Sequence, residues 1–454
     1  MKMKTIFLII PHYVFSSDLL HTGFIKLLSD KYKIIVFSPI FYVNNPDHYY
    51  QSPNITYIPW QEKRPKFWNF FTKTLRVALI SEFDNLEYFK LRGLMKINLN
   101  RQRKLLRTIG FFLPRQILTA DFFTKLESLL TPVSNDFKEL INKYHPNIVL
   151  TCTPGFSSAE SEIIIMAKKI GLKTIAINSS WDNFTSNATQ FRKTDYIICW
   201  NEVMRQEAIS IHNYNPNKVF VSGIYRFDHH FEKHENELSR EEFLKSKKLN
   251  PAKKTLLLST VPPNTYPPQY DVWRKIIQKH KENAFGEPVN LLIRLHPNDS
   301  LEKYKEFEGI NNVHIELPGK QKNKTSSGGH KIEMDKVDLD NLRYSLKYTD
   351  ININFRSSLS LEATIYDKPI INLALFDYAN RYHVDWYIPI IESGGVRLVT
   401  TEDELNKAII DYLNHPEKDK DGRKKIFNDY IEFSDGLSYK RSAEAVEHIL
   451  KTIS

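Results

Sequence analysis

The chain has few cysteines, few glycines and no long apolar segment. Its 454 residues include two cysteines, Cys152 and Cys199, and 15 glycines. Two cysteines cannot build a disulfide scaffold or a multi-cysteine zinc site, and this glycine content excludes collagen-like and low-complexity architectures. A membrane-spanning helix needs about 20 consecutive apolar residues, and no such stretch is present. We therefore expect a reduced, cytoplasmic protein whose apolar run near the N-terminus is a buried strand rather than a signal peptide.

Several fingerprints of catalysis are also missing. The sequence has no Gly-x-Gly-x-x-Gly run, no Gly-x-x-x-x-Gly-Lys-Ser/Thr loop and no Gly-x-Ser-x-Gly elbow. Their absence disfavours dinucleotide oxidoreductases, ATPases and enzymes with that serine nucleophile. No compact Asp-x-Asp element follows a strand, which argues against metal-dependent, single-domain sugar transferases. The pair His229-His230 lacks further ligands at metal spacing, so neither a metal site nor a cofactor is predicted.

Positive charge is concentrated in one segment. The whole chain carries a formal charge of +10, and residues 61–125 contain fourteen basic and five acidic residues together with many aromatic rings. Basic residues interleaved with aromatics suit the headgroup region of an anionic bilayer. Ordinary helices with solvated basic faces explain the same pattern. Nucleic acid is not a predicted partner, because no nucleic-acid-binding motif occurs elsewhere in the chain.

Apolar runs of strand length alternate with helical patterns along the chain. The expected strands are 4–10, 33–38, 147–151, 173–178, 196–199 and 218–222, then 255–259, 289–295, 313–317, 351–354 and 369–373. Residues 12–18 are expected to form a loop and 19–29 the first helix. Alternation of Val/Ile-rich strands with helices predicts parallel sheets that are covered on both faces.

A polar stretch, 228–254, interrupts this alternation and marks a domain boundary. The predicted fold class is therefore α/β, with two tandem Rossmann-like doubly wound domains and an interdomain cleft. The predicted organisation is an N-terminal domain 1–227 that includes the basic-aromatic segment, a linker 228–252, a C-terminal domain 253–436 and a final helix 437–454.

Polar residues follow three predicted strands of the second domain, where ligands of doubly wound sheets bind. They are Ser259 and Thr260, then Arg294 and His296, and finally Ser357, Ser358 and Glu362 at a strand-to-helix junction. The serine pair and its backbone N–H groups suit phosphate oxygens. Arg294 and His296 suit a pyrophosphate, and Glu362 suits ribose hydroxyls. Plain helix capping by the serines and a simple turn at His296-Pro297 would explain the same residues without a ligand.

The first domain offers candidates for holding an acceptor. Trp181, Asp182 and Asn183 follow a predicted strand, and a ring beside amides and a carboxylate suits a sugar. Asp182 is the candidate general base, and His12, beyond the first strand, is the second candidate. Asp18 lies on the same early loop and is a further acceptor-binding candidate. An Asx turn with a core tryptophan would equally explain the Trp181 run.

The chain resembles bacterial GT-B-type glycosyltransferases of surface polysaccharide synthesis over residues 145–454. Its His-Pro and Ser-Ser elements are also similar to those of CDP-glycerol glycerophosphotransferases and, more loosely, UDP-N-acetylglucosamine 2-epimerases. The resemblance rests on the runs at 180–185, 194–202, 219–228, 294–297, 357–363, 367–370, 394–397 and 435–438.

The resemblance implies that the second domain holds a nucleotide-sugar donor through Arg294, His296, Ser357, Ser358 and Glu362. It adds His383 and Arg397 as further donor-binding residues. One departure is visible, since relatives often carry Lys-Gly where this chain has Ser186-Asn187-Ala188.

The expected function follows from these elements. The protein would be a metal-independent glycosyltransferase that moves a sugar from a nucleotide donor to a lipid-linked or polymeric glycan, at the inner face of the membrane. A capsule or lipopolysaccharide is the expected product. The same residues also suit a glycerophosphotransferase that uses CDP-glycerol, which would need histidines at the phosphorus and has His12 and His296 available. A non-catalytic binding or scaffold protein and an epimerase are the two remaining hypotheses.

Overall fold

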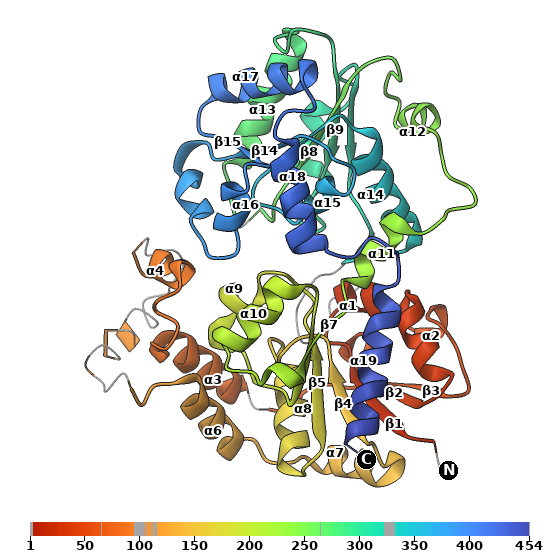
Figure 1. The fold of residues 1–454 in the computed structure, drawn as a ribbon, viewed down its shortest axis with the longest axis vertical. Coiled ribbons are helices and arrows are strands. Elements are labelled where there is room, and N and C mark those ends of the chain that lie inside the picture. Colours follow the sequence, from red (N-terminus) through yellow and green to blue (C-terminus); the bar gives the residue numbers. More distant parts are fainter. Residues whose placement is uncertain are drawn as a thin grey trace. The chain divides into compact units, whose positions relative to one another are not determined.

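The chain forms two compact units, which are described separately (Figure 1). The computed structural model describes residues 3–64, 66–94, 105–106, 108–109, 112, 116–263, 265–321 and 332–453. Unit 1 contains Met1–Tyr225 and Leu437–Ser454, and unit 2 contains Arg226–Gln321 and Ile332–Gly436. The predicted linker 228–252 lies within unit 2. Within the described ranges, no helix has the length and apolar character needed to cross a bilayer.

Unit 1 is built on a seven-stranded parallel sheet with the order β3-β2-β1-β4-β5-β6-β7. The strands are β1 (Thr5–Ile9), β2 (Lys33–Ser38), β3 (Ile55–Pro59), β4 (Ile148–Thr151), β5 (Lys173–Ile177), β6 (Tyr196–Cys199) and β7 (Val219–Val221). Phe7, Ile35 and Val149 of neighbouring strands are buried together in one core cluster. Burial on both faces explains why these strands are continuous apolar runs.

Helices cover this sheet. They are α1 (Tyr13–Leu20), α2 (Gly23–Ser29), α3 (Lys66–Leu79), α4 (Glu87–Leu94), α6 (Ala120–Leu130), α7 (Asn135–Tyr144), α8 (Ser158–Lys169), α9 (Asn183–Ser186), α10 (Glu202–Ser210) and α19 (Ser438–Thr452). The predicted loop 12–18 is wrong, because helix α1 begins at Tyr13. The predicted helix 19–29 is divided, since Thr22 caps α2 by accepting a hydrogen bond from the Phe24 backbone N–H.

The C-terminal helix α19 belongs to unit 1 and packs against α2. Gly23 makes this approach possible, because a Cβ atom at that position would lie 2.5 Å from Cε2 of Tyr439. Ser222, directly after β7, is also joined to α19. Its hydroxyl accepts a hydrogen bond from Ser442 Oγ at 2.9 Å. The last helix is therefore an integral part of the N-terminal unit.

Unit 2 contains a six-stranded parallel sheet with the order β10-β9-β8-β13-β14-β15 and a separate pair, β11 with β12. Its strands are β8 (Thr255–Ser259), β9 (Asn290–Arg294), β10 (Val313–Glu316), β11 (Lys320–Gln321), β12 (Ile332–Glu333), β13 (Ile351–Asn354), β14 (Ile370–Leu373) and β15 (Arg397–Val399). Its helices are α11 (Tyr225–Phe231), α12 (Arg240–Ser246), α13 (Gln269–Lys281), α14 (Lys336–Tyr348), α15 (Leu359–Thr364), α16 (Ile388–Glu392), α17 (Glu402–Asn414) and α18 (Lys420–Ile426).

Both sheets place their strands in the order of a doubly wound Rossmann fold, counted from the first strand of each unit. This arrangement confirms the predicted fold class. The strand order reverses between β1 and β4 in unit 1 and between β8 and β13 in unit 2. Ligands of such sheets bind at these reversal points, beyond the carboxyl ends of the strands. We therefore expect a ligand-binding site at the loops that follow β1, β4, β8 and β13.

Candidate functional site

A row of polar residues crosses the carboxyl ends of the unit 2 strands. The strand register pairs Glu316 of β10 with Arg294 of β9, and Arg294 with Ser259 of β8. It continues from Ser259 to Asn354 of β13, and from Asn354 to Asn372 of β14. Residues paired in register on parallel strands point to the same face of the sheet. Residues far apart in the sequence therefore form one polar edge at the reversal point.

Arg294 lies in this row, and one nitrogen of its guanidinium, Nη2, has no hydrogen-bond partner among the described residues. Its Nη1 pairs with Glu316, whose other oxygen accepts a hydrogen bond from Lys247 Nζ at 2.6 Å. Burial would raise the pKa of Glu316, but Arg294 and Lys247 together lower it. Arg294 Nη2 and the neighbouring Ser259 Oγ are buried and have no hydrogen-bond partner among the described residues. Buried polar atoms without partners are costly, so this pair points to a ligand.

The loop after β9 is tied to the end of β8. Thr260 Oγ1 accepts a hydrogen bond from the His296 backbone N–H at 2.7 Å and contacts Asp299 Oδ2 at 3.3 Å. His296 Nδ1 in turn accepts the backbone N–H of Asn298 at 3.0 Å. In the neutral ring this contact leaves the proton on Nε2. His296 is therefore arranged to present an N–H donor, which suits a phosphate oxygen.

The loop from β13 to α15 has an unusual backbone. Arg356 has a φ of 42°, in the left-handed region that non-glycine residues seldom occupy. The Tyr382 hydroxyl accepts a hydrogen bond from the Arg356 backbone N–H at 3.1 Å and so supports this conformation. Asn354 Oδ1 accepts the Ser357 N–H at 3.1 Å, and Ser357 Oγ accepts the N–H of Leu359 at 3.2 Å. Ser357 thus makes a capping contact, and Ser358 precedes the first residue of α15.

A buried network of asparagines fixes this loop, and sequence reasoning missed it. Asn372 Nδ2 donates to Asn354 Oδ1 at 3.1 Å and to Ser360 Oγ at 3.2 Å. The Tyr387 hydroxyl donates to Ser360 Oγ at 3.0 Å and also contacts Asn372. The signal in the sequence was the alternation Ile-Asn-Ile-Asn at 351–354, which places amides inside a buried strand. The hydrogen bonds among Asn354, Asn372, Ser360 and Tyr387 rigidify the site edge.

Glu362, on α15, is buried and faces α11. Its Oε2 lies 3.3 Å from His230 Nε2, and His230 Nδ1 lies 3.0 Å from the Tyr366 hydroxyl. Among the described residues, His230 is therefore the hydrogen-bond partner of Oε2. The structure places Glu362 one turn after the Ser357-Ser358 junction, on the same helix.

The two remaining predicted donor residues differ in position. His383 follows the 3-10 helical segment Phe376–Tyr382 and is exposed, and its donor role remains a prediction. Arg397 is the first residue of β15 and so lies at the amino end of the strand. Its guanidinium pairs with Asp411 Oδ2 at 2.7 Å and Asp419 Oδ2 at 2.9 Å. The structure therefore does not bring Arg397 to the polar edge.

The acceptor candidates of unit 1 form a compact turn after β5. Asp182 Oδ1 accepts a hydrogen bond from Ser180 Oγ at 2.5 Å, and Oδ2 accepts one from Ser186 Oγ at 2.8 Å. Asn183 is buried, and its amide group contacts Asn178 Oδ1 and Asn187 Nδ2. Trp181 is buried as well, as expected for a core tryptophan. A base role for Asp182 remains a prediction.

The early loop is partly helical. His12 precedes α1 directly after β1, at the reversal point of the unit 1 sheet. Asp18 lies within α1 and is buried. His12 therefore occupies a position where a ligand of this sheet would bind, whereas Asp18 lies inside the helix.

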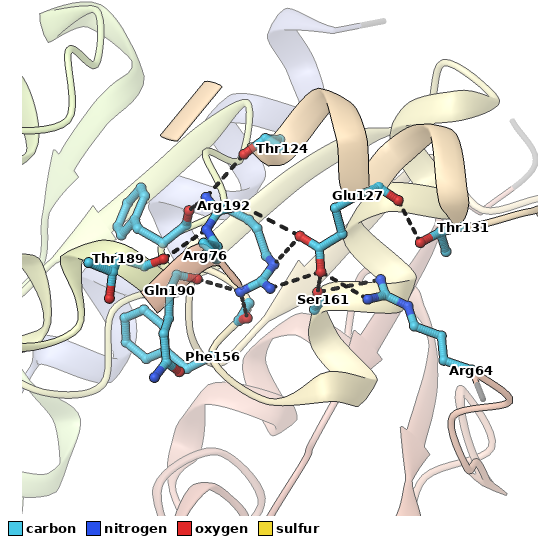
Figure 2. Close-up of polar contacts among 12 residues, drawn as sticks. Arg64, Arg76, Thr124, Glu127, Thr131, Phe156, Ser161, Thr189, Gln190 and Arg192 are labelled. Carbon is cyan, nitrogen blue, oxygen red and sulfur yellow. Dashed lines mark hydrogen bonds and ion pairs between the residues drawn. The ribbon is translucent and has the colours of Figure 1, made fainter. Parts of the chain in front are cut away.

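In unit 1, the turn that follows β4 lies at the other side of the reversal point and is held by a buried cluster of ion pairs around Glu127 of α6 (Figure 2). Glu127 pairs with Arg64 at 2.9 Å, Arg76 at 3.5 Å and Arg192 at 2.9 Å. Burial would raise the pKa of Glu127, but Arg192, Arg64 and Arg76 lower it to about 2. Arg192 Nη1 also donates to the Gly155 carbonyl oxygen at 2.8 Å. The cluster thereby holds the turn that follows β4.

Gly155 is required at this turn. Its φ is 85°, and a Cβ atom there would lie 2.7 Å from Cδ of Arg192. The adjacent Thr153 is held by Glu160 of α8, whose carboxylate accepts the Thr153 backbone N–H at 2.8 Å. The turn is therefore positioned from both sides by buried ionisable groups.

Comparison with known proteins agrees with this two-unit architecture. The chain is similar to the UDP-GlcNAc 2-epimerase of Neisseria meningitidis bound to UDP-GlcNAc, at 13% identity and a TM-score of 0.52, over 99% of this chain and 100% of that one. The epimerase of Methanocaldococcus jannaschii gives the same identity and TM-score over 99% of both chains. Wall teichoic acid polymerase TagF, in a structure soaked with CDPG, gives 12% identity and a TM-score of 0.51 over 99% of this chain and 89% of that one. No curated protein sequence matches significantly.

The two Rossmann-like units form a GT-B-type fold. The sequence profile of the CDP-glycerol:poly(glycerophosphate) glycerophosphotransferase family matches residues 162–448, which is more than half of the chain. The chain belongs to this family. It is therefore a transferase that uses a nucleotide-activated donor in the synthesis of surface polymers, as the sequence predicted.

Proposed function

We propose that unit 2 binds the nucleotide diphosphate of a nucleotide sugar at the polar edge and that unit 1 binds a glycan or lipid-linked acceptor. The observation that carries this proposal is the pair of buried, unpartnered polar atoms, Arg294 Nη2 and Ser259 Oγ, at the sheet's reversal point. Arg294, the His296 Nε2–H and Ser358, at the start of α15, would contact the phosphates. Glu362 would accept hydrogen bonds from the ribose.

The proposed chemistry follows from the charge that develops during transfer. As the bond between the sugar and the diphosphate breaks, negative charge grows on the leaving phosphate oxygen. Arg294 and the N–H of His296 would stabilise that charge from fixed positions. Asp182 would accept the proton of the acceptor hydroxyl, with His12 as the second candidate. The hydroxyls of Ser180 and Ser186 would keep the Asp182 carboxylate oriented.

A second candidate is transfer of glycerol phosphate from CDP-glycerol. The family match favours it, and so does the donor tautomer of His296. TagF, one of the structural neighbours, was itself soaked with CDPG. In this case the phosphate nearer the glycerol would be attacked, and His296 would stabilise the phosphorus centre rather than a leaving diphosphate.

A donor panel tests the proposal and separates the two candidates. The purified chain is incubated with CDP-glycerol and with UDP-, GDP-, CDP- and TDP-sugars, and release of the nucleotide is measured. The nucleoside monophosphate CMP indicates glycerophosphate transfer, whereas a nucleoside diphosphate indicates sugar transfer. Thermal unfolding with UDP, GDP, CDP, CMP and TDP gives an independent measure of nucleotide binding. Absence of nucleotide binding and of nucleotide release in every case would support a non-catalytic scaffold.

We also propose that the basic-aromatic segment 61–125 contacts an anionic membrane at its cytoplasmic face, where lipid-linked acceptors of a capsule or similar polymer would lie. Support comes from apolar side chains that are largely exposed in this segment, namely Leu105, Ile109, Phe112 and Ile117. Not all of the positive charge is available for this contact, because Arg64 and Arg76 form buried ion pairs with Glu127. Arg101, Arg103, Lys104 and Arg107 lie outside the described residues.

Vesicle binding tests this second part. The wild-type chain should sediment together with vesicles that contain anionic phospholipid. The triple variant Leu105→Ser, Ile109→Ser, Phe112→Ser should bind these vesicles several-fold less. The matched control is Leu301→Ser with Val337→Ser, which removes exposed apolar residues from unit 2. Equal binding of the wild type to neutral and anionic vesicles would contradict the proposal.

A further inference from the structure

Three potential metal ligands meet in unit 2, apart from the polar edge. His229 lies in α11, His234 follows that helix, and Asp340 belongs to α14. His229 Nε2 is 2.9 Å from Asp340 Oδ1, and His234 Nδ1 is 3.7 Å from the same oxygen. One ligand atom from each residue lies within 4.8 Å of the others. The side chains of the two histidines are about nine-tenths buried, with exposures of 11% and 10%.

The hydrogen bonds of His234 fix the direction of its lone pair. Its Nε2 lies 2.9 Å from the His229 carbonyl oxygen, which can only accept, so Nε2 carries the proton. In the neutral ring Nδ1 then presents a lone pair toward the Asp340 carboxylate. A protonated ring would direct an N–H there, but 3.7 Å is beyond hydrogen-bond distance. A lone pair and a carboxylate facing each other at this separation leave room for a cation between them.

A carboxylate also lies near the second ring nitrogen of His229. Its Nδ1 is 3.9 Å from Glu232 Oε2, which is beyond hydrogen-bond distance in this structure. When a metal occupies Nε2, the ring proton lies on Nδ1, and a small shift of the exposed Glu232 side chain would let it accept that proton, as carboxylates do behind many metal-binding histidines.

One nearby cation opposes metal binding. Arg343 Nε lies 4.0 Å from Asp340 Oδ1. Its charge is partly offset, because Arg343 Nη1 pairs with Glu237 Oε1 at 3.1 Å, an oxygen that Lys347 also contacts. Counted with Glu232, the carboxylates around the two histidines outnumber this arginine. The local electrostatics therefore permit a divalent ion.

We propose that His229 Nε2, His234 Nδ1 and a carboxylate oxygen of Asp340 bind a divalent transition-metal ion of the zinc type. Two imidazoles with one carboxylate match the preferred ligands of Zn²⁺, and water would complete a tetrahedral shell. The sequence predicted no metal here, because the adjacent pair His229-His230 has no further ligands at metal spacing. In the structure His230 instead contacts Glu362, and His234 supplies the second imidazole.

The ion would join α11 to α14 and act at a distance from the reacting atoms. His230 follows His229 directly and contacts Glu362, so a fixed α11 would hold His230 against the proposed ribose-binding carboxylate. This is a positioning role, and it leaves the transfer step itself free of the metal. The inference goes beyond the proposed function and does not depend on it.

Metal content of the tag-free, full-length chain tests the proposal directly. Protein stripped with a chelator and dialysed against Zn²⁺ should retain one equivalent by mass spectrometry of the metal. Co²⁺ in place of Zn²⁺ should give the intense visible absorption of a tetrahedral site. His234→Ala and Asp340→Asn should each lose this equivalent and the absorption. Glu232→Gln should weaken binding by about 10-fold or more, as expected for a partner of a ligating histidine.

The matched control is His415→Ala with Glu417→Gln. These two residues form an exposed histidine–carboxylate pair at 3.5 Å without a second imidazole. The control should keep the full metal content and affinity of the wild type. The proposal is overturned if the wild type retains no Zn²⁺, or if His234→Ala and Asp340→Asn bind as much as the control. Because the readout is metal content, either result stands whether or not a donor substrate is found.

Discussion

Nε2 of His230 lies 3.3 Å from Oε2 of Glu362, and both side chains are buried. His230 belongs to α11, at the start of the polar stretch that the sequence marks as a linker. Glu362 belongs to α15, next to the proposed phosphate-binding serines. The contact shows that the beginning of the expected linker is packed into unit 2, against the candidate nucleotide site.

Removal of the Glu362 carboxylate should weaken nucleotide binding. We expect Glu362→Ala to lower the affinity for the cognate nucleotide by about 10- to 100-fold, since a hydrogen bond to a charged group contributes about 1.5–3 kcal/mol. Isothermal titration calorimetry measures the effect, and thermal unfolding checks the fold. Glu302→Ala, on an exposed side chain of the same unit, is the control. Unchanged affinity in Glu362→Ala would exclude this residue from the site.

Arg294 can be tested without leaving Glu316 as a buried unpaired charge. Arg294→Lys keeps a cation beside Glu316 but removes the Nη2 that has no partner. We expect at least about 10-fold weaker binding of a nucleoside diphosphate and little change for the nucleoside itself, with stability preserved. Arg274→Lys, on an exposed face of α13, is the control. If the diphosphate binds both variants as tightly as the wild type, the pyrophosphate lies elsewhere.

Asp182 should affect turnover rather than donor binding. Asp182→Asn keeps the size of the side chain but removes its basicity, so kcat should fall by on the order of 10²- to 10⁴-fold. The donor affinity should stay within about twofold. Ser186→Ala removes only one of the two hydroxyls on Asp182 and should have a smaller effect. Wild-type kcat in Asp182→Asn would move the base role to His12.

The sequence predicted best the strands that are buried on both faces of their sheet. The ranges 33–38, 196–199, 255–259 and 351–354 coincide with β2, β6, β8 and β13. In the first three, an apolar run with polar flanks fixes both ends of a buried strand, whereas β13 alternates isoleucine with asparagine. Strands β3 and β15 and the short pair β11 and β12 were missed. Strands β3 and β15 are half-buried at sheet edges and mix polar with apolar residues, although the edge strands β7 and β10 were predicted.

The sequence predicted those site residues that directly follow a recognisable strand, but not the contacts among residues far apart in the chain. The residues that follow strands were found, since ligand positions in this fold class are known from topology. The register that places Ser259 between Arg294 and Asn354 was not predictable, because it depends on how the strands pair. Asn372 was missed because the role of a polar residue in a buried strand cannot be inferred until its hydrogen-bond partners are known. His234 and Asp340 meet only through the packing of α11 on α14.

The Glu127 cluster should make part of the stability depend on pH. Its pKa is about 2 in the folded chain and about 4.3 in an unfolded one. This stabilisation, about 3 kcal/mol, is present above pH 4.3 and is lost as the pH falls toward 2. Glu127→Gln should therefore lower the free energy of unfolding by about 3 kcal/mol at pH 7 in urea, and the deficit should shrink at pH 3. Glu139→Gln, exposed on α7, should cost less than about 0.5 kcal/mol. An equal deficit at both pH values would mean that the three arginines do not hold Glu127 ionised.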